Sequence, residues 1–262
     1  MYVERPATPD LTRRVACEWV RTSSAAATTL VVPDGCIDLI WGPEGLFVAG
    51  PDTGPMPASV GAGDALAGIR FRPGAAGGFF GVPLHELRDQ RVALADLPGI
   101  LDPGILDPGI LDLDLDLGTG ADRGDVHGDV RGDVHGDVKA RLAAMRAAVR
   151  RRLVAGADAP DPAAPAVAAG LRAGRSIAQV ASDLGFSERH LHRRCVAAFG
   201  YAPKTVQRVL RFQHALRLAR AGVPLAEVAV TAGYADQAHL AHDVRRLSGG
   251  PIRRLLSPAR AA

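Results

Sequence analysis

Two segments in the last third of the chain share one pattern, in which a helix with an apolar face is followed by a glycine turn and a second helix. The first segment covers residues 176–199 and the second covers 225–247. In the first, apolar residues recur at the spacing of one helix face: Ile177, Val180, Ala181 and Leu184. Gly185 can end that helix in the left-handed conformation, and Ser187 can cap the next. The pattern predicts a helix-turn-helix, whose second helix enters a DNA major groove.

The second segment follows the same plan, with Gly233 at the turn and Asp236 as the cap. Between the two segments, the sequence predicts a long helix over 203–220, because Pro203 is tolerated in a first turn and Gly222 follows the end. A helix of that length spans roughly 27 Å. This is close to one turn of B-DNA, so the two second helices could enter successive major grooves on one face of the duplex.

The charge is divided unevenly along the chain. From residue 170 onward, 15 Lys and Arg stand against 5 Asp and Glu, a net charge of +10, which leaves −7 for residues 1–169 of the whole-chain total of +3. A basic region of this kind is typical of proteins that bind a polyanion. A solvated helix surface is the alternative explanation. Together with two helix-turn-helix patterns, the charge favours nucleic acid.

Other features of the chain limit its class. The 262 residues are enough for two domains, each with its own core. There is no apolar stretch of membrane-spanning length and no signal sequence. The cysteines Cys17, Cys36 and Cys195 are widely spaced and form no CxxC pair, which argues against disulfides and zinc. We therefore expect a cytoplasmic protein without a metal or another cofactor.

Residues 1–95 contain short apolar runs separated by turns, at TTLVV, CIDLIW, LFVAG and LAGIRFRP, with a short helix expected around AAGGFFG. This pattern is typical of a small β-barrel or sandwich. Five residues of these runs could line an effector pocket, although each taken singly could be core or rim: Cys36, Asp38, Trp41, Arg70 and Arg72. Because His85 is the one histidine before residue 96, a metal-dependent enzyme is disfavoured.

Residues 96–138 are low-complexity repeats with periods of five and four residues. We expect a solvated loop there; loose metal binding by His127 and His135, or adhesion through the RGD triplets at 123–125 and 131–133, are weaker alternatives. A helix is predicted over 139–156. Its apolar stripe could pack on the N-terminal domain or pair with a second subunit. Residues 157–169 are predicted to be a linker and 170–262 a DNA-binding domain.

The C-terminal run IAQVASDLGFSERHLHRR, FG, APK, VLRFQHALRLAR and LAEVAVTAGYADQAHLAHDVRRLSGGP resembles the DNA-binding domain of AraC/XylS-type transcriptional regulators over about 176–251. It departs from that family at Cys195 and Val244, where phenylalanine is usual, and one residue instead of two separates Gly249 from Pro251. The N-terminal half resembles an uncharacterised, cupin-like sensor domain found in some regulators of this family. The implied fold class is α+β, with a small cupin-like β-barrel followed by an all-α domain.

This resemblance implies which side chains contact DNA. The implied base contacts are Arg189, His192, Arg193, Gln237, His239 and His242. Arg can bond guanine and Gln can bond adenine through two hydrogen bonds. The expected phosphate contacts are Ser187, Lys204, Arg208, Arg211, Arg245 and Arg246. Because Asp236 and Asp243 would repel phosphate, we expect the first unit to contribute more of the affinity.

The leading hypothesis is a transcription regulator that binds double-stranded DNA, is controlled by a small-molecule effector and acts as a monomer or homodimer. One alternative is an effector-independent regulator, whose N-terminal half dimerises or recruits a partner such as RNA polymerase. A less favoured alternative is an enzyme fused to a DNA-binding domain. No constellation of catalytic residues stands at a recognisable spacing, so we expect no enzymatic activity.

Overall fold

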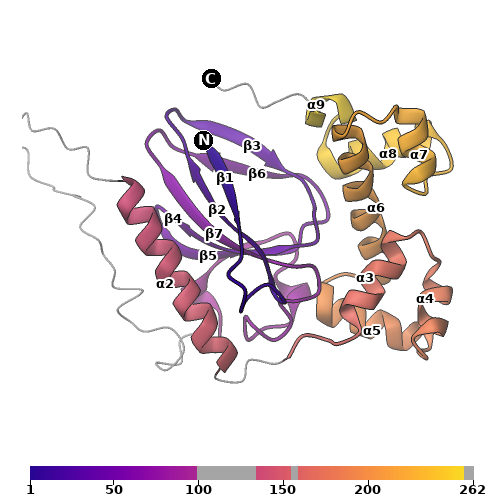
Figure 1. Ribbon diagram of the computed structural model, residues 1–262, viewed down its shortest axis with the longest axis horizontal. Helices are drawn as coiled ribbons and strands as arrows, with labels where there is room; N and C mark the ends of the chain where they lie inside the picture. The colour runs from indigo at the N-terminus through magenta and orange to yellow at the C-terminus, as the bar shows by residue number, and fades with distance from the viewer. Residues whose placement is uncertain (99–133, 155–158, 257–262) are drawn as a thin grey trace, which may run out of the picture.

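The computed structural model describes residues 1–98, 134–154 and 159–256, which form a sheet-rich N-terminal domain and a helical C-terminal domain (Figure 1). The predicted α+β class is confirmed. Residues 99–133 lie outside the described residues, as do the expectations for His127 and both RGD triplets. None of the described helices has the length and apolar character needed to cross a membrane.

The N-terminal domain contains a six-stranded antiparallel sheet and a two-stranded one. In order across the larger sheet, the strands are β1 (Tyr2–Pro6), β2 (Val15–Thr22), β7 (Ala65–Phe71), β4 (Ile37–Gly42), β5 (Gly45–Ala49) and β8 (Arg91–Ala93). The smaller sheet pairs β3 (Ala27–Val31) with β6 (Met56–Val60). Four of these strands match the apolar runs of the sequence, and β1, β2, β6 and β8 were not predicted.

The segment AAGGFFG forms turns, so the short helix expected there is wrong. Gly74 before the segment, Gly78 inside it and Gly81 at its end have positive φ angles of 79°, 70° and 72°, which a right-handed helix excludes. Two short 3₁₀ helices follow, η1 (Leu84–Glu86) and η2 (Leu94–Asp96).

Helix α2 (Val134–Val154) packs along one face of the larger sheet (Figure 1). Leu142, Met145 and Val149 on its apolar stripe are buried in the core of the same chain. Arg146 forms an ion pair with Glu18 on β2, with 2.6 Å between Nη2 and Oε2. The stripe that could have paired with a second subunit is thus covered by the chain's own sheet.

The described part of the C-terminal domain, up to residue 256, contains seven helices: α3 (Ala164–Arg172), α4 (Ile177–Asp183), α5 (Glu188–Phe199), α6 (Pro203–Arg220), α7 (Leu225–Thr231), α8 (Gln237–Ser248) and α9 (Ile252–Leu256). Two apolar cores share α6, one with α3–α5 and the other with α7–α9. The bounds of α6 are those predicted from the sequence.

Helix α3 begins inside the stretch expected to be a linker. Pro165 lies in its first turn, where a proline costs no helical hydrogen bond, and the alanines around it favour helix. Val167 and Leu171 are buried in the first core. The helical domain therefore starts earlier than the predicted residue 170.

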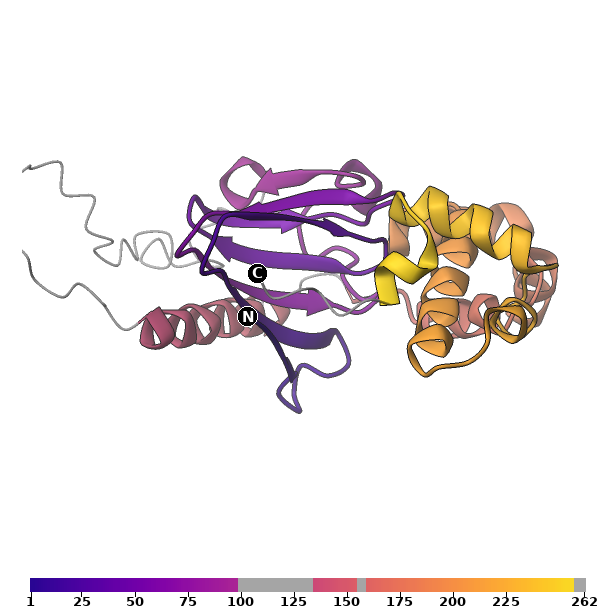
Figure 2. The ribbon, with the colours of Figure 1, turned by 90° about the horizontal axis from the view of Figure 1, so that it is seen from above.

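The helical domain packs against one end of the sheet domain (Figure 2). The Tyr201 hydroxyl donates a hydrogen bond of 2.6 Å to the carbonyl oxygen of Asp52. Nε2 of Gln213, on α6, donates one of 2.6 Å to the carbonyl oxygen of Pro33. Val32 packs against the second helical core. Both halves of the helical domain thus contact the N-terminal domain.

Candidate nucleic-acid interface

Two side-chain caps fix where α5 and α8 begin. Ser187 Oγ accepts a hydrogen bond from the His190 amide at 3.2 Å, and Asp236 Oδ1 accepts one from the His239 amide at 2.7 Å. In each unit the turn before the cap contains a left-handed glycine, Gly185 in the first and Gly233 in the second. The two units therefore present their second helices by the same local geometry.

The first unit exposes a basic stripe on α5. Its buried side is formed by Leu191, Cys195, Ala198 and Phe199. Arg189, His192 and Arg193 are exposed on the opposite side, and they lie within about 100° of one another because successive residues turn by about 100°. The structure thus brings together the three side chains that the sequence assigned to base contacts in this unit.

In the second unit, the positions assigned to base contacts include no arginine or lysine. Gln237 and His242 of α8 are exposed, and His239 is half-buried. The His239 ring lies edge-on to Tyr234, with centroids 5.2 Å apart, and its Nδ1 accepts from the Ala235 amide at 3.4 Å. His239 thus has contacts within the domain that Gln237 and His242 do not show among the described residues.

A buried ion pair joins α8 to α6. Asp243 is 5 % exposed, and its Oδ2 accepts from Nη2 of Arg211 at 2.6 Å. The Arg211 guanidinium also lies 4.2 Å from the centroid of the Tyr234 ring. Burial raises the pKa of Tyr234 to about 12, so its phenol stays neutral. Asp243 therefore faces inward and is paired, contrary to the expectation that it would repel phosphate, and Asp236 caps its own helix.

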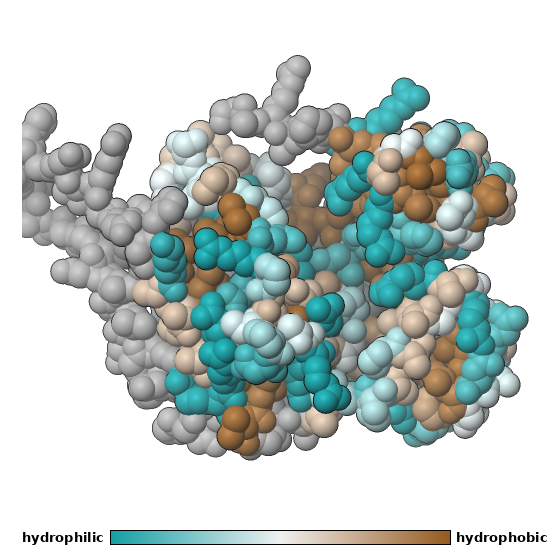
Figure 3. All heavy atoms as spheres, viewed as in Figure 1, coloured by the Kyte–Doolittle hydropathy of each residue, from teal (hydrophilic) through white to brown (hydrophobic). Residues whose placement is uncertain are grey.

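A groove of about 410 Å³ separates the two units. Figure 3 shows the units as separate lobes beside the N-terminal domain. Lys204 and Arg211, two of the predicted phosphate contacts, line this groove together with Ser176 and Gln207. The Nε of Arg211 is buried and has no hydrogen-bond partner among the described residues. Of the other predicted contacts, Ser187, Arg245 and Arg246 are exposed and Arg208 is half-buried.

Sequence reasoning did not include Ser176 and Gln207 in this interface. Ser176 caps α4 and Gln179 reaches back to the Ser176 amide, which is a complete capping box. The spacing Ser-x-x-Gln before an apolar face could have located this helix start. No comparable signal identifies Gln207, whose Nε2 donates to the carbonyl oxygen of Arg175.

Three of the five predicted effector residues lie together on the sheet. The strand register places Asp38 of β4 opposite Arg70 of β7. Asp38 Oδ1 accepts from Arg70 Nε at 3.1 Å and from Trp19 Nε1 at 2.9 Å. The Cys36 amide donates to Asp34, whose Oδ2 lies 3.7 Å from Arg70 Nε. Burial raises the pKa of Asp38 to about 6 and that of Cys36 above its usual range.

The other two predicted effector residues lie away from this polar cluster. Trp41 is three residues from Asp38, so it points to the other face of β4, where it is buried in the core and lies 5.5 Å from the Arg141 guanidinium. Arg72 follows the end of β7 and donates from Nε to the carbonyl oxygen of Thr12. Trp19 was missed because β2 was not predicted. The described residues contain no group of three or more side chains able to hold a metal ion.

Models of known protein families match both domains. A model described as a helix-turn-helix domain matches residues 180–257, and one for a domain of unknown function (DUF6597) matches residues 3–93. The C-terminal domain is an AraC-type helix-turn-helix domain. The chain is thus a DNA-binding transcriptional regulator. A comparison with curated proteins found no match.

Several solved structures are similar to this chain. A probable AraC family transcriptional regulator from Rhodopseudomonas palustris is 24% identical over 37% of this chain and 92% of its own, with a TM-score of 0.31. An apo variant of ToxT from Vibrio cholerae with a single lysine-to-alanine substitution is 10% identical over 92% of this chain and 96% of its own, with a TM-score of 0.44. ToxT bound to an unsaturated fatty acid is 8% identical over 90% and 93%, with a TM-score of 0.42.

Proposed function

We propose that this regulator recognises a specific DNA sequence by placing α5 and α8 in successive major grooves on one face of the duplex. The observation that carries the proposal is the pair of capped helices, each with exposed polar side chains, at opposite ends of α6. The 18 residues of α6 correspond to roughly 27 Å, close to one turn of B-DNA. A single chain can then bind an asymmetric site.

The two helices contribute different chemistry. Arg189 and Arg193 suit guanine and Gln237 suits adenine, while His192 and His242 supply single hydrogen bonds to base edges. His239 contributes less, because its ring is held against Tyr234.

The groove between the units supports a phosphate contact. Lys204 is exposed there, and the Arg211 side chain lines the same groove. A DNA backbone crossing from one groove to the next would pass between the two units. Ser187, Arg208, Arg245 and Arg246 are proposed as further phosphate contacts, which position the protein without specifying sequence.

Binding to duplexes selected from a random-sequence pool, measured across a salt series, tests this function. Lys204→Ala should lower the slope of log Kd against log salt by about 1 and leave the sequence preference intact, since one phosphate contact is lost. Arg220→Ala is the matched control, because Arg220 is exposed at the far end of α6. Binding that is insensitive to salt and to Arg189→Ala would contradict the proposal.

We also propose that the N-terminal domain binds a small-molecule effector near Cys36, Asp38 and Arg70. The supporting observation is a polar cluster that places a buried carboxylate and a guanidinium side by side on the sheet. Thermal stabilisation of the chain by members of a small-molecule library, abolished in Arg70→Met, would support an effector. If no compound raises the melting temperature, the effector is contradicted.

An effector-independent regulator is the second candidate. It is favoured by one observation, namely that Asp38 and Arg70 already satisfy each other, with Trp19 as a further donor. In that case the N-terminal domain would act by dimerising or by contacting RNA polymerase. Measuring the mass of the chain in solution, free and with DNA, distinguishes a monomer from a dimer.

A further inference from the structure

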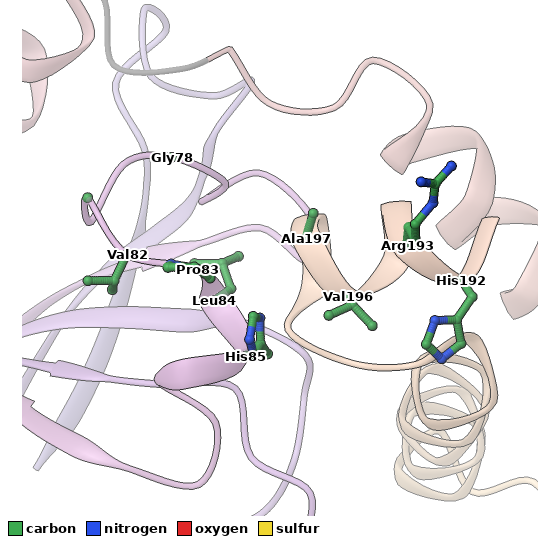
Figure 4. A pocket seen from close by; sticks show the side chains of 10 residues that line it. Gly78, Val82, Pro83, Leu84, His85, His192, Arg193, Val196 and Ala197 are labelled. Carbon is green, nitrogen blue, oxygen red and sulfur yellow. The ribbon is translucent and has the colours of Figure 1, made fainter. Parts of the chain in front are cut away.

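A cleft of about 650 Å³ separates the N-terminal domain from α5 (Figure 4). The wall on the N-terminal side is formed by residues 78 and 81–85, which include Val82 and His85. The opposite wall belongs to the middle of α5. It consists of His192, Arg193, Val196 and Ala197. Two of the three proposed base-contacting residues of the first unit, His192 and Arg193, therefore line this cleft with exposed side chains, and Val196 and Ala197 lie nearer to the N-terminal wall (Figure 4).

The four α5 residues of the cleft lie on the side of the helix that would face DNA. With about 100° of turn per residue, they occupy one stripe opposite the buried Leu191 and Cys195. Arg189 lies on the same stripe, one turn earlier along the helix. The wall at 81–85 thus stands in front of the DNA-facing stripe of α5, toward the C-terminal end of that helix.

The end of α5 is fixed to the N-terminal domain. Tyr201 is 1 % exposed, and its hydroxyl bonds the carbonyl oxygen of Asp52. Gly200 ends α5 with a φ of 73°. A Cβ at Gly200 would lie 2.7 Å from Pro51 Cγ and 2.9 Å from the Leu84 carbonyl oxygen, so the two backbones approach here as closely as glycine allows. These contacts hold the cleft at its present width.

The second unit meets the N-terminal domain differently. A Cβ at Gly249, the residue that ends α8, would lie 3.5 Å from Pro55 Cγ. Gln237 and His242 lie nearer the start of the helix and are exposed. The N-terminal domain therefore contacts the end of α8 without covering the side chains proposed to contact bases.

We propose that DNA and residues 81–85 of the N-terminal domain compete for the same stripe of α5, so that this arrangement excludes duplex from the first unit and leaves the second unit free. A helix in a major groove about 12 Å wide and 8.5 Å deep has sugar-phosphate backbone on both of its flanks. The 81–85 wall faces the same stripe across the cleft, so a duplex seated on α5 would meet it. The inference rests on the proposed DNA-binding function, and it adds that binding through α5 requires separation of the two domains.

A cross-link across the cleft tests this competition in the full chain. His85→Cys and Val196→Cys place thiols on opposite walls, where a bismaleimide with a reducible internal disulfide can join them. The native thiols react slowly, because burial raises the pKa of Cys17 to about 11 and that of Cys195 to about 12, and only the thiolate attacks. The probe is a duplex selected from a random pool by the unlinked chain, and the measurement is its hydroxyl-radical footprint.

The cross-linked chain should protect the half-site of the second unit and lose the half-site of the first, and reduction of the linker should restore both. Equal protection of both half-sites by the linked and unlinked chains would overturn the competition alone. A pair of cysteines that does not cross-link would also overturn it. If neither the linked nor the reduced chain protects any DNA, the DNA-binding function itself fails.

Removing the Tyr201 hydroxyl should have the opposite effect on DNA binding. Tyr201→Phe removes the hydrogen bond to Asp52, so the domains separate more readily and the affinity for DNA should rise about threefold to tenfold. Tyr2→Phe is the matched control, because its hydroxyl bonds Glu4 on the exposed strand β1, far from α5 in the sequence. Unchanged or weaker binding by Tyr201→Phe, with Tyr2→Phe at the wild-type affinity, would contradict the proposal.

Discussion

The two helix-turn-helix units have the same backbone plan and different surfaces. Each has a left-handed glycine in its turn and a capped second helix. The first exposes Arg189 and Arg193, whereas the second exposes Gln237 and turns its acidic Asp243 inward onto Arg211. Duplication of a scaffold thus preserves caps and turns, and leaves the side chains of the second helix free to diverge.

The units also differ in what holds them. The second is tied to α6 by the buried Asp243–Arg211 pair, while the first is tied to the N-terminal domain through Tyr201. A signal from the N-terminal domain therefore has a direct contact with the end of the first recognition helix. We expect regulation to act mainly on the first half of the DNA site.

The largest predicted effect is on the stability of the second unit. Asp243→Ala leaves the half-buried Arg211 without its buried carboxylate partner, and we expect a loss of about 3 kcal/mol in the free energy of unfolding. Chemical denaturation measures it. The double variant Asp243→Leu, Arg211→Met should recover most of the loss, because it removes the arginine that pairs most closely with Asp243, while the more distant Arg208, at 4.0 Å, is partly exposed to solvent. An Asp243→Ala variant as stable as wild type would remove this difference between the units.

The next largest effect is expected on the affinity for DNA. Arg189→Ala should weaken binding to a selected duplex by about tenfold to a hundredfold, because a bidentate contact to guanine contributes about 1–3 kcal/mol. Gln237→Ala should weaken it less, since the amide is uncharged and forms no charge-assisted hydrogen bond. Fluorescence anisotropy at one fixed salt concentration compares them. A greater loss for Gln237→Ala would reverse the expected order of the units.

The smallest difference between the two units is expected in the stability that the N-terminal caps of α5 and α8 contribute. Ser187→Ala and Asp236→Ala each remove one side-chain acceptor from a helix start and should each cost about 1 kcal/mol of stability. Thermal unfolding of the two variants should give similar shifts. A difference of more than about twofold between them would show that the caps, too, have diverged.

Local rules predicted much of the helical domain. The bounds of α6, the left-handed glycines and both caps follow from turn and cap preferences that act over a few residues. The inward turn of Asp243 does not follow from them, because it depends on Arg211, which is 32 residues away. A charged residue on a surface helix is ordinarily solvated, so no periodicity in the sequence could have placed it inside.

The N-terminal domain was less predictable for the same reason. Strands β1 and β8 are short, and β1 is exposed along its whole length, so neither has an apolar run to mark it. Asp38, Arg70 and Trp19 meet only through the register of three strands. The separation of Trp41 from Asp38, by contrast, follows from strand alternation alone and was available from the sequence.

In the function proposed here, one chain binds two adjacent major grooves through two unequal units. Hydroxyl-radical footprinting of the full chain on a selected duplex tests it directly. We expect two protected patches about one helical turn apart on one face, with Arg189→Ala abolishing one patch and Gln237→Ala weakening the other. A single patch, or two patches that both disappear with either variant at a palindromic site bound by two chains, would contradict it.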